Sequence, residues 1–499
     1  MGLLHVILPE VSAPSTTNNM RGEELLLRRI VFSFLCLLIY LTLSSIPVYG
    51  AFEMYSGHDP LYAQRLILSA NRGSLLELGV SPIITAGMFL QVLESAGIVK
   101  HGDNSKEYRQ KSTRVAALLL SFLQAVLIVS SGVYGSMKVL GYGNAILIVL
   151  QLFIASWIVL LMDEAMIKGH GLGSGVTLFM CAHICTDVIW RSFCPFMLTN
   201  GKESNFVGIF VAIPHILFTR RSVFKALYEI FFREGLSNLF GLVSMVLVST
   251  ITLYVDTLSV DLPLKVVKGG GGRGAVDCGA LDRYSIPLLY TSSMPVMLYF
   301  TAVGNFLFIS QVLFMSYPRH AFIKMIGSWE QGRGNGQLVP TSGIAYLISS
   351  PNSITAVLSD PFQFIFYICF VLAACSMLSQ MYVELSGTDA KTIAQQLVQK
   401  GLSLRGHRES NLYKSLNRYI PTAASLGGII IGAISLFADF TGCMVSGSGI
   451  LIVTSSIYSY TQSLKSEKHL GKLGLKDILK NLVVFLPFGP NGGDNKQKT

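Results

Sequence analysis

The segment Ser69–Gly87, which reads SANRGSLLELGVSPIITAG, decides the fold because its character changes half-way along it. It joins Leu61–Leu78, a charged and mildly amphipathic stretch with a break at Gly73, to a short apolar piece, Val80–Leu93. A broken helix at membrane depth is tolerated only where it lies against protein or lines a water-filled cavity. The segment therefore predicts a membrane protein with an internal cavity that Leu61–Leu78 enters.

The rest of the 499-residue chain has the composition of a membrane protein. Apolar residues make up 51% of it and charged residues 13%, against roughly 25% charge in soluble domains. The chain contains ten apolar stretches that could span a bilayer. They are Ile30–Val48, Val80–Leu93, Val115–Tyr134, Ala145–Met162, Val176–Phe193, Leu239–Tyr254, Ile286–Leu313, Phe362–Leu378, Ile420–Phe440 and Gly447–Tyr460. Two shorter apolar pieces, Phe206–Phe218 and Leu482–Phe488, favour an interfacial or re-entrant position.

Basic residues set the expected orientation. With ten spans both termini lie on one side, and the segments on that side hold 26 of the 38 Lys and Arg residues. The positive-inside rule then predicts cytosolic termini. Two of these basic segments are long: 259–285, with the glycine run Gly269–Gly274, and 384–415. Each is either a docking site for a large anionic partner or a solvated loop that only fixes the topology.

Chemistry inside the spans is sparse. His183 and Asp187, one helical turn apart, form either a proton relay or a structural pair. No motif for a hydrolase, a nucleotide site or a zinc site is present, and the eight cysteines lack a CxxC pair. We therefore expect no enzyme, no cofactor and no metal. A small-molecule secondary transporter, which also uses broken helices, is one class that these features allow.

Six motifs then carry a resemblance, in one order along the chain. They are VILPE at Val6–Glu10, the segment Ser69–Gly87, GLGSG at Gly171–Gly175, VDLPLK at Val260–Lys265, RGHR at Arg405–Arg408 and LNRYIPTAA at Leu416–Ala424. Together they resemble the SecY/Sec translocon alpha-subunit family in its eukaryotic form, over about Val6–Tyr460. This resemblance implies a protein-conducting channel of the endoplasmic reticulum membrane.

The family fold that this resemblance implies is an all-α membrane protein. Ten transmembrane helices form two inverted five-helix halves around an hourglass pore with a plug and a lateral gate. The chain would divide into a cytosolic amphipathic segment (1–29), an N-terminal half (30–194, plug 61–79), a lumenal hinge loop (195–238), a C-terminal half (239–462, cytosolic loops 259–285 and 384–415) and a cytosolic basic tail (463–499).

The resemblance also implies roles for particular residues. The pore ring would consist of Val80, Ile84, Val176, Met180, Met297 and Ile452. The polar residues of the lateral gate would be Thr85, Gln124 and Asn305, and the residues that orient signal sequences would be Arg65, Arg72 and Glu384. The contacts to the ribosome would be Arg273, Arg405 and Arg408. Bulky apolar side chains suit a ring because they dewet a narrow constriction. The loop around Arg273 is longer and richer in glycine than the family's usual form.

The partners that the resemblance implies are the nascent polypeptide with its signal sequence, small beta and gamma subunits in a heterotrimer, the lipid bilayer, and the ribosome with its ribosomal RNA. Post-translational translocation subunits and a lumenal chaperone could join them. A specialised paralogue of the translocon is an alternative within the same family.

Overall fold

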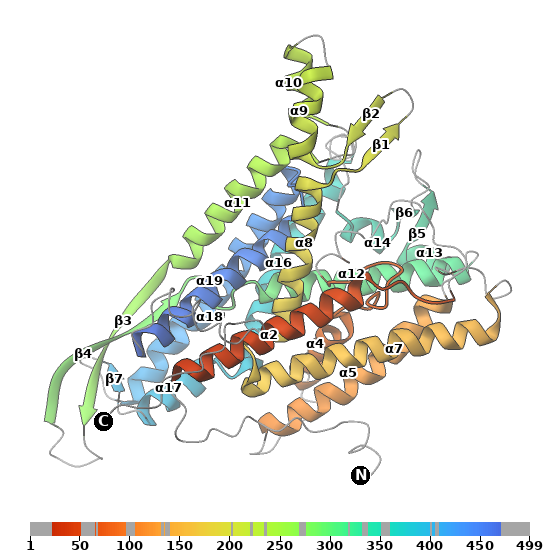
Figure 1. Cartoon of the computed structure of the whole chain (residues 1–499). Coiled ribbons are helices and arrows are strands. Elements are labelled where there is room, and N and C mark those ends of the chain that lie inside the picture. Colours follow the sequence, from red (N-terminus) through yellow and green to blue (C-terminus); the bar gives the residue numbers. More distant parts are fainter. Residues whose placement is uncertain are drawn as a thin grey trace, which may run out of the picture.

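The computed structural model describes residues 22–50, 65, 68–95, 105–130, 134, 140–200, 203–219, 223–233, 237–268, 276–317, 320–331, 338–350, 360–399, 402–404 and 409–470. Each of the ten apolar stretches predicted above coincides at least in part with a helix of 15 or more residues (Figure 1). The first five helices are α2 (Gly22–Ser45), α4 (Ser81–Ser95), α5 (Ser105–Ser130), α7 (Tyr142–Ala165) and α8 (Gly175–Phe193). The second five are α11 (Leu239–Thr257), α12 (Met294–Ser316), α16 (Pro361–Ser386), α18 (Glu409–Phe440) and α19 (Gly447–Leu470).

Seven of these ten helices are long and apolar enough to cross a membrane by length and composition: α2, α5, α7, α11, α12, α16 and α18. The other three differ for visible reasons. Helix α4 has only 15 residues, α8 contains His183, Asp187 and Arg191, and α19 is rich in serine. A helix that packs inside a bundle needs less apolar surface than one that faces lipid.

The observed bounds differ from the predicted spans at several ends. Helix α18 begins at Glu409 and not at Ile420, because the polar residues before Ile420 continue the helix beyond the apolar stretch. Helix α12 begins at Met294 and not at Ile286, because strand β4 (Val276–Pro287) takes the residues before it. The apolar piece Phe206–Phe218 forms a short helix, α9 (Ile209–Thr219).

Small antiparallel sheets add to the helices outside the spans. Strands β1 (Met197–Asn200) and β2 (Glu203–Phe206) form one, and β5 (Ser328–Gln331) and β6 (Leu338–Ser342) another. The third has the order β4-β3-β7, where β3 is Ser259–Lys268 and β7 is Leu402–Leu404. Since β3 and β7 come from different loops, this sheet joins the two long basic segments at one end of the molecule.

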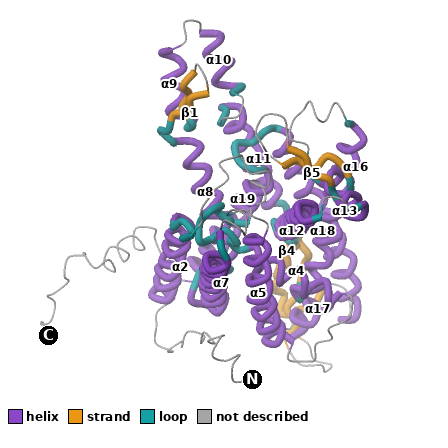
Figure 2. Tube along the Cα trace, turned by 90° about the vertical axis from the view of Figure 1, so that its right-hand side faces the viewer, coloured by secondary structure: helices purple, strands orange, loops and turns teal. Residues whose placement is uncertain are grey.

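The remaining helices are short. They are η1, a π-helix (Met166–His170), α9, α10 (Val223–Phe231), α13 (Ala321–Ile326), α14 (Ile344–Ile348) and α17 (Ala390–Gln399). Helix α17 packs against α18 through a buried face that includes Ile393 and Leu397. Helices α9 and α10 form a hairpin that stands clear of the bundle (Figure 2). This hairpin lies at the end of α11 opposite to the β3–β4 strands (Figure 1).

Candidate functional site

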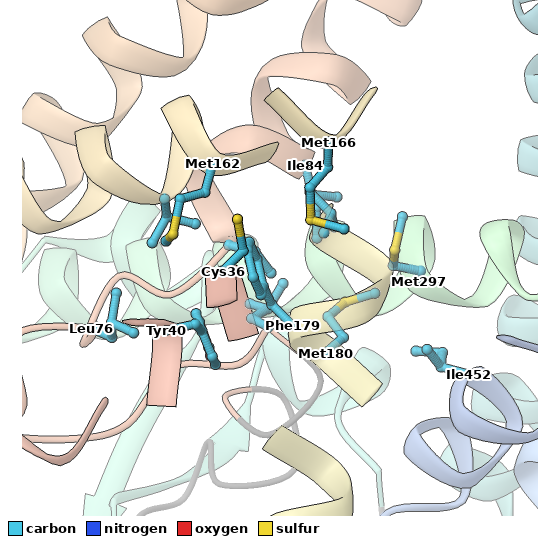
Figure 3. Close-up of a cluster of buried hydrophobic side chains, with 14 of the residues drawn as sticks. Cys36, Tyr40, Leu76, Ile84, Met162, Met166, Phe179, Met180, Met297 and Ile452 are labelled. Carbon is cyan, nitrogen blue, oxygen red and sulfur yellow. The ribbon is translucent and has the colours of Figure 1, made fainter. Parts of the chain in front are cut away.

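The six residues predicted for the pore ring lie in one buried hydrophobic cluster. Val80 directly precedes α4 and Ile84 lies within it, Val176 and Met180 come from α8, Met297 from α12 and Ile452 from α19. Each side chain is at most 7% exposed. In Figure 3, Met297 and Ile452 lie on the opposite side of Met180 from Leu76 and Tyr40. The cluster therefore draws on both halves of the chain and fills the space between them.

The segment before α4 is packed directly against this cluster. Leu68 and Leu76 are buried members of it. Tyr40 of α2 is also buried there, stacked on Phe179 of α8 with ring centroids 4.7 Å apart. Apolar residues of the segment thus extend the cluster, which also takes side chains from α2, α4, α7, η1, α8, α12 and α19.

Hydrogen bonds hold this segment on α2. The Tyr40 hydroxyl donates to the Ser69 carbonyl at 2.7 Å, and the Asn71 side-chain amide donates to the Ser44 carbonyl at 2.8 Å. The backbone also pairs, since the Val48 amide donates to Gly73 O at 3.0 Å and the Leu75 amide to Ile46 O at 3.0 Å. The segment is therefore an ordered turn structure fixed by reversible polar contacts.

Glu77 is a buried acid within the same segment, 3% exposed. One carboxylate oxygen lies 3.1 Å from the Arg65 guanidinium. The other accepts hydrogen bonds from the Gly73 amide and from the hydroxyl of Tyr134. A buried carboxylate needs such partners because its desolvation is costly. The sequence marks Glu77 only as a charge near a helix break, and nothing in it points to Tyr134, which is 57 residues away.

Gly79 is required where the segment turns into α4. Its φ is +53°, and a Cβ at this position would lie 2.4 Å from the Leu68 carbonyl oxygen. Any other residue would push the backbone at position 79 away from the backbone at Leu68 and Ser69. The Val80 amide, next along the chain, donates to that same carbonyl at 3.0 Å. Gly79 therefore sets the start of α4 and so the position of Val80.

The polar residues predicted for the lateral gate do not bond to one another. Thr85 donates to the Ser81 carbonyl of its own helix at 2.6 Å. Gln124 of α5 and Asn305 of α12 instead line a common cavity of about 80 Å³. Phe308, one turn after Asn305, packs across this seam against the cluster that contains Leu78 and Ile128. Apolar contact therefore closes the seam between α5 and α12, and sequence reasoning missed Phe308.

The opposite seam, between α8 and α19, is hydrogen-bonded. The Thr177 and Tyr460 hydroxyls lie 3.2 Å apart, and the Arg191 guanidinium donates at 3.2 Å to the carbonyl of Met444, in the turn before α19. Arg191 also pairs with Asp187 at 2.9 Å. The pairing with Arg191 favours the structural interpretation of Asp187 over a relay with His183.

A cavity of about 530 Å³ adjoins the buried cluster at Met166. The glycine-rich turn from Gly169 to Ser174 lines it, together with Arg29 of α2 and Tyr460 of α19. The Asp163 carboxylate accepts a hydrogen bond from the Val176 amide at 3.0 Å at the start of α8. This contact fixes the first cluster residue of α8 beside the cavity. The glycine pattern at Gly171–Gly175 thus shapes a wide opening that leads to the cluster.

Other predicted residues lie at the edges or beyond the described part. Arg65 and Arg72 belong to the turn segment, where Arg72 is half-buried, and Glu384 is exposed near the end of α16. Arg273, Arg405 and Arg408 lie outside the described residues. So do 1–21 and 471–499, which hold most of the predicted terminal segments.

Comparison with known proteins accounts for this arrangement. The family described as SecY matches residues 74–461, and the plug domain of Sec61p matches residues 38–73. The chain belongs to the SecY family. The Sec61 alpha subunit of Dictyostelium discoideum is 39% identical over 465 residues, 93% of this chain and 95% of that protein. The corresponding subunit of Debaryomyces hansenii is 38% identical over 468 residues, again 93% and 95%.

Solved structures agree on the fold. A structure described as a protein-conducting channel matches 93% of this chain and 96% of its own with a TM-score of 0.72 at 24% identity. Sec61 in the canine ribosome-channel complex matches with a TM-score of 0.69, also at 24% identity and over 93% and 96% of the two chains. The predicted family and its ten-span fold with a plug are confirmed.

Proposed function

We infer that this chain is the pore-forming subunit of the protein translocation channel of the endoplasmic reticulum. It passes nascent secretory polypeptides across the membrane and releases transmembrane segments sideways into lipid. The observation that supports this function most directly is the buried apolar cluster shared by both halves, with the plug segment packed on it. Membership of the SecY family favours this function over a small-molecule transporter.

The cluster acts as the pore ring. A channel for unfolded polypeptide must pass varied side chains and still block ions. Bulky apolar residues at a constriction achieve this because water leaves a narrow apolar space. Met180 and Met297 add flexible thioether side chains, which can close around a passing chain of irregular shape. The cavity beside Met166 is the cytosolic entrance to this ring.

The lateral gate opens between α5 and α12. The α8–α19 seam is hydrogen-bonded, so it serves as the hinge side. The α5–α12 seam depends on contacts of Phe308 and leaves Gln124 and Asn305 beside a cavity. A signal sequence gains roughly 0.8 kcal/mol for each CH₂ group that it moves out of water. A few such groups offset the modest closing energy of an apolar seam.

The plug is released by exchange of weak contacts. A signal sequence that enters the seam reaches Leu68 and Arg65, which line the cavity between Gln124 and Asn305. Moving Arg65 also disturbs its ion pair with Glu77. Opening of the gate and release of the plug are therefore coupled through one residue. Arg65, Arg72 and Glu384 would then bias the orientation of the signal by their charges.

The sheet β4-β3-β7 is the framework of the ribosome site. It brings 259–268 and 402–404 together, and Arg405 directly follows β7 in the sequence. Arginine suits ribosomal RNA because its guanidinium bonds phosphates in a bidentate manner. Sec61 of the canine complex and Ssh1 of the yeast complex are structural relatives that occur on ribosomes. Both termini and this sheet would face the cytosol. The small beta and gamma subunits would complete a heterotrimer.

Site-specific photocrosslinking tests the proposal. A photoreactive amino acid at Ile84 or Met180 is probed with a stalled ribosome–nascent chain that carries a signal sequence. Val246, an exposed residue on α11, is the control position. We expect adducts with the nascent chain from Ile84 and Met180 and none from Val246. A chain that assembles and binds ribosomes without adducts at Ile84 and Met180 would not be a general conduit, and would instead be a specialised paralogue.

A further inference from the structure

The hairpin of α9 and α10 connects the two halves of the channel and has a core of its own. Ala212 and Ile216 of α9 pack against Ala226 and Ile230 of α10, and all four are at most 4% exposed. Within each pair the residues are one turn apart, so each helix uses one face for this contact. The hairpin stands away from the bundle in both views (Figures 1 and 2). Its outward faces are therefore open to the surroundings.

The outward flank of α10 is aromatic. Phe224 is 89% exposed and Tyr228 69%, and Leu227 and Phe231 are exposed beside them. At 100° per residue these four residues share one flank of the helix, whereas Glu229 lies on the other side. An apolar flank opposite a charged one is typical of a helix that lies in a membrane interface.

This flank continues into the lipid-facing surface of the bundle. The Tyr228 ring lies 5.4 Å from that of Phe232, which in turn stacks on Phe240 at 5.9 Å. Phe240 begins the exposed apolar face of α11, which includes Val243 and Val246. Since α11 is long and apolar enough to span the membrane, lipid covers that face. A run of aromatic side chains thus leads from lipid to α10 without a polar interruption.

A second group of aromatic residues lies where the end of α8 leads into the hairpin. Phe193, at the end of α8, stacks on Phe210 of α9 at 5.0 Å, and Trp190 lies 5.8 Å from Phe196. All four side chains are exposed. Aromatic residues collect at the level of the lipid headgroups, where their rings are partly desolvated. The two groups therefore mark the membrane surface on both sides of the hairpin.

We propose that the aromatic flank of α10 inserts among the phospholipids of the leaflet at the α8 and α11 ends, and so anchors the connection between the two halves. This leaflet is the lumenal one if the proposed function and orientation hold. The anchor would fix the pivot about which the halves move, because α8 of the first half leads into the hairpin and α11 of the second half follows it.

Lipid photocrosslinking in native membranes tests this inference. Benzoylphenylalanine replaces Phe224, an aromatic and almost fully exposed residue, so the substitution leaves the fold intact. Two matched variants carry benzoylphenylalanine elsewhere: one at Glu229, on the other flank of α10, and one at Val246, on the lipid-facing side of α11. The membranes contain radiolabelled phosphatidylcholine. We expect Phe224→benzoylphenylalanine to form lipid adducts about as well as the Val246 variant, and the Glu229 variant to form few.

Two results would overturn the inference. Adducts with a protein at position 224 would show that a lumenal partner covers the flank. Adducts with neither lipid nor protein would show that it faces water. The same membranes report nascent-chain adducts from benzoylphenylalanine at Ile84, so a failure of the lipid anchor is distinguished from a failure of the channel function.

Discussion

At the scale of single residues, the closed state depends on a few side chains with opposite chemistry. Val80, Ile84 and Met180 are apolar and buried, and in the proposed channel they would exclude water from the constriction. Glu77, a few residues before Val80, is buried as well, but it is held by Arg65 and Tyr134. In the proposed channel the apolar residues would make the seal, and the acid with its partners would hold the plug beside it. The following two predictions separate these contributions.

Replacing Ile84 with Asp should wet the constriction. A carboxylate in the cluster carries its hydration shell, so the apolar barrier to ions is lost. We expect resting ion conductance across reconstituted bilayers to rise roughly tenfold or more, in line with a barrier loss of more than 1.4 kcal/mol. Ile84→Val, which keeps the apolar character, is the control and should stay tight. An unchanged conductance of the Asp variant would remove Ile84 from the ring.

Replacing Glu77 with Gln should loosen the plug. The amide keeps the shape of the side chain but removes the charge that pairs with Arg65, at a cost of about 1–3 kcal/mol. We expect signal sequences of low hydrophobicity to open the channel more efficiently, measured by translocation of a reporter series. In the double variant Arg65→Gln, Glu77→Gln the effect should be smaller than the sum of the two single effects. Additive effects would mean that the pair is not coupled.

At the scale of elements, the two seams between the halves differ in kind. The α8–α19 seam has directional contacts at Thr177 and Arg191. The α5–α12 seam closes through Phe308 and contains a cavity. Directional bonds keep two helices in register while they rotate, whereas apolar contact separates when another apolar surface replaces it. These contacts therefore predict that the channel opens at the α5–α12 seam and not at the α8–α19 seam.

Replacing Phe308 with Ala should weaken the closed gate by about 1–3 kcal/mol, because burial of one large apolar side chain is lost. Signal sequences that the native channel rejects should then insert, which a translocation assay with graded signals measures. Phe306→Ala on the same helix is the control, because Phe306 shares with Phe308 the packing inside the C-terminal half but not the packing across the seam. Equal effects of the two variants would point to a general loss of stability and not to the gate.

At the scale of the whole molecule, the chain separates its tasks along its length. The β4-β3-β7 sheet and the α9–α10 hairpin lie at opposite ends of α11 (Figure 1). The sheet carries the basic segments and the hairpin carries the aromatic ones. The pore cluster lies between the halves. Docking, conduction and membrane anchoring are therefore proposed for separate surfaces of the molecule.

Reversing the charges of Arg405 and Arg408 to Glu should weaken ribosome binding without disturbing assembly. Each lost phosphate contact should lower the salt dependence of binding by about one unit in the log–log slope. Co-sedimentation with ribosomes over a salt series measures this. Lys391→Glu, an exposed residue on α17, is the control for charge reversal. Unchanged binding at moderate salt would move the docking site to another surface.

The sequence by itself determined the family, the ten helices and the residues of the pore cluster. Apolar length shows in the sequence because a bilayer demands it, and the motifs around Ser69–Gly87 and Leu416–Ala424 align the six cluster residues with a family pattern. The structure brings these six together as predicted, although their role in blocking ions stays a prediction. The roles of Arg273, Arg405 and Arg408 at the ribosome also stay predictions, since these residues lie outside the described part of the chain.

The tertiary structure alone decided which polar groups meet. Tyr134 reaches Glu77 across 57 positions, Phe308 closes a seam to α5, and β7 joins β3 from a distant loop. It also showed that the hydroxyl of Thr85, a predicted gate residue, bonds to its own helix. Apolar burial follows from local composition because it has no direction. Hydrogen bonds, ion pairs and strand pairing depend on distance and angle between remote residues, which the order of residues along the chain does not state.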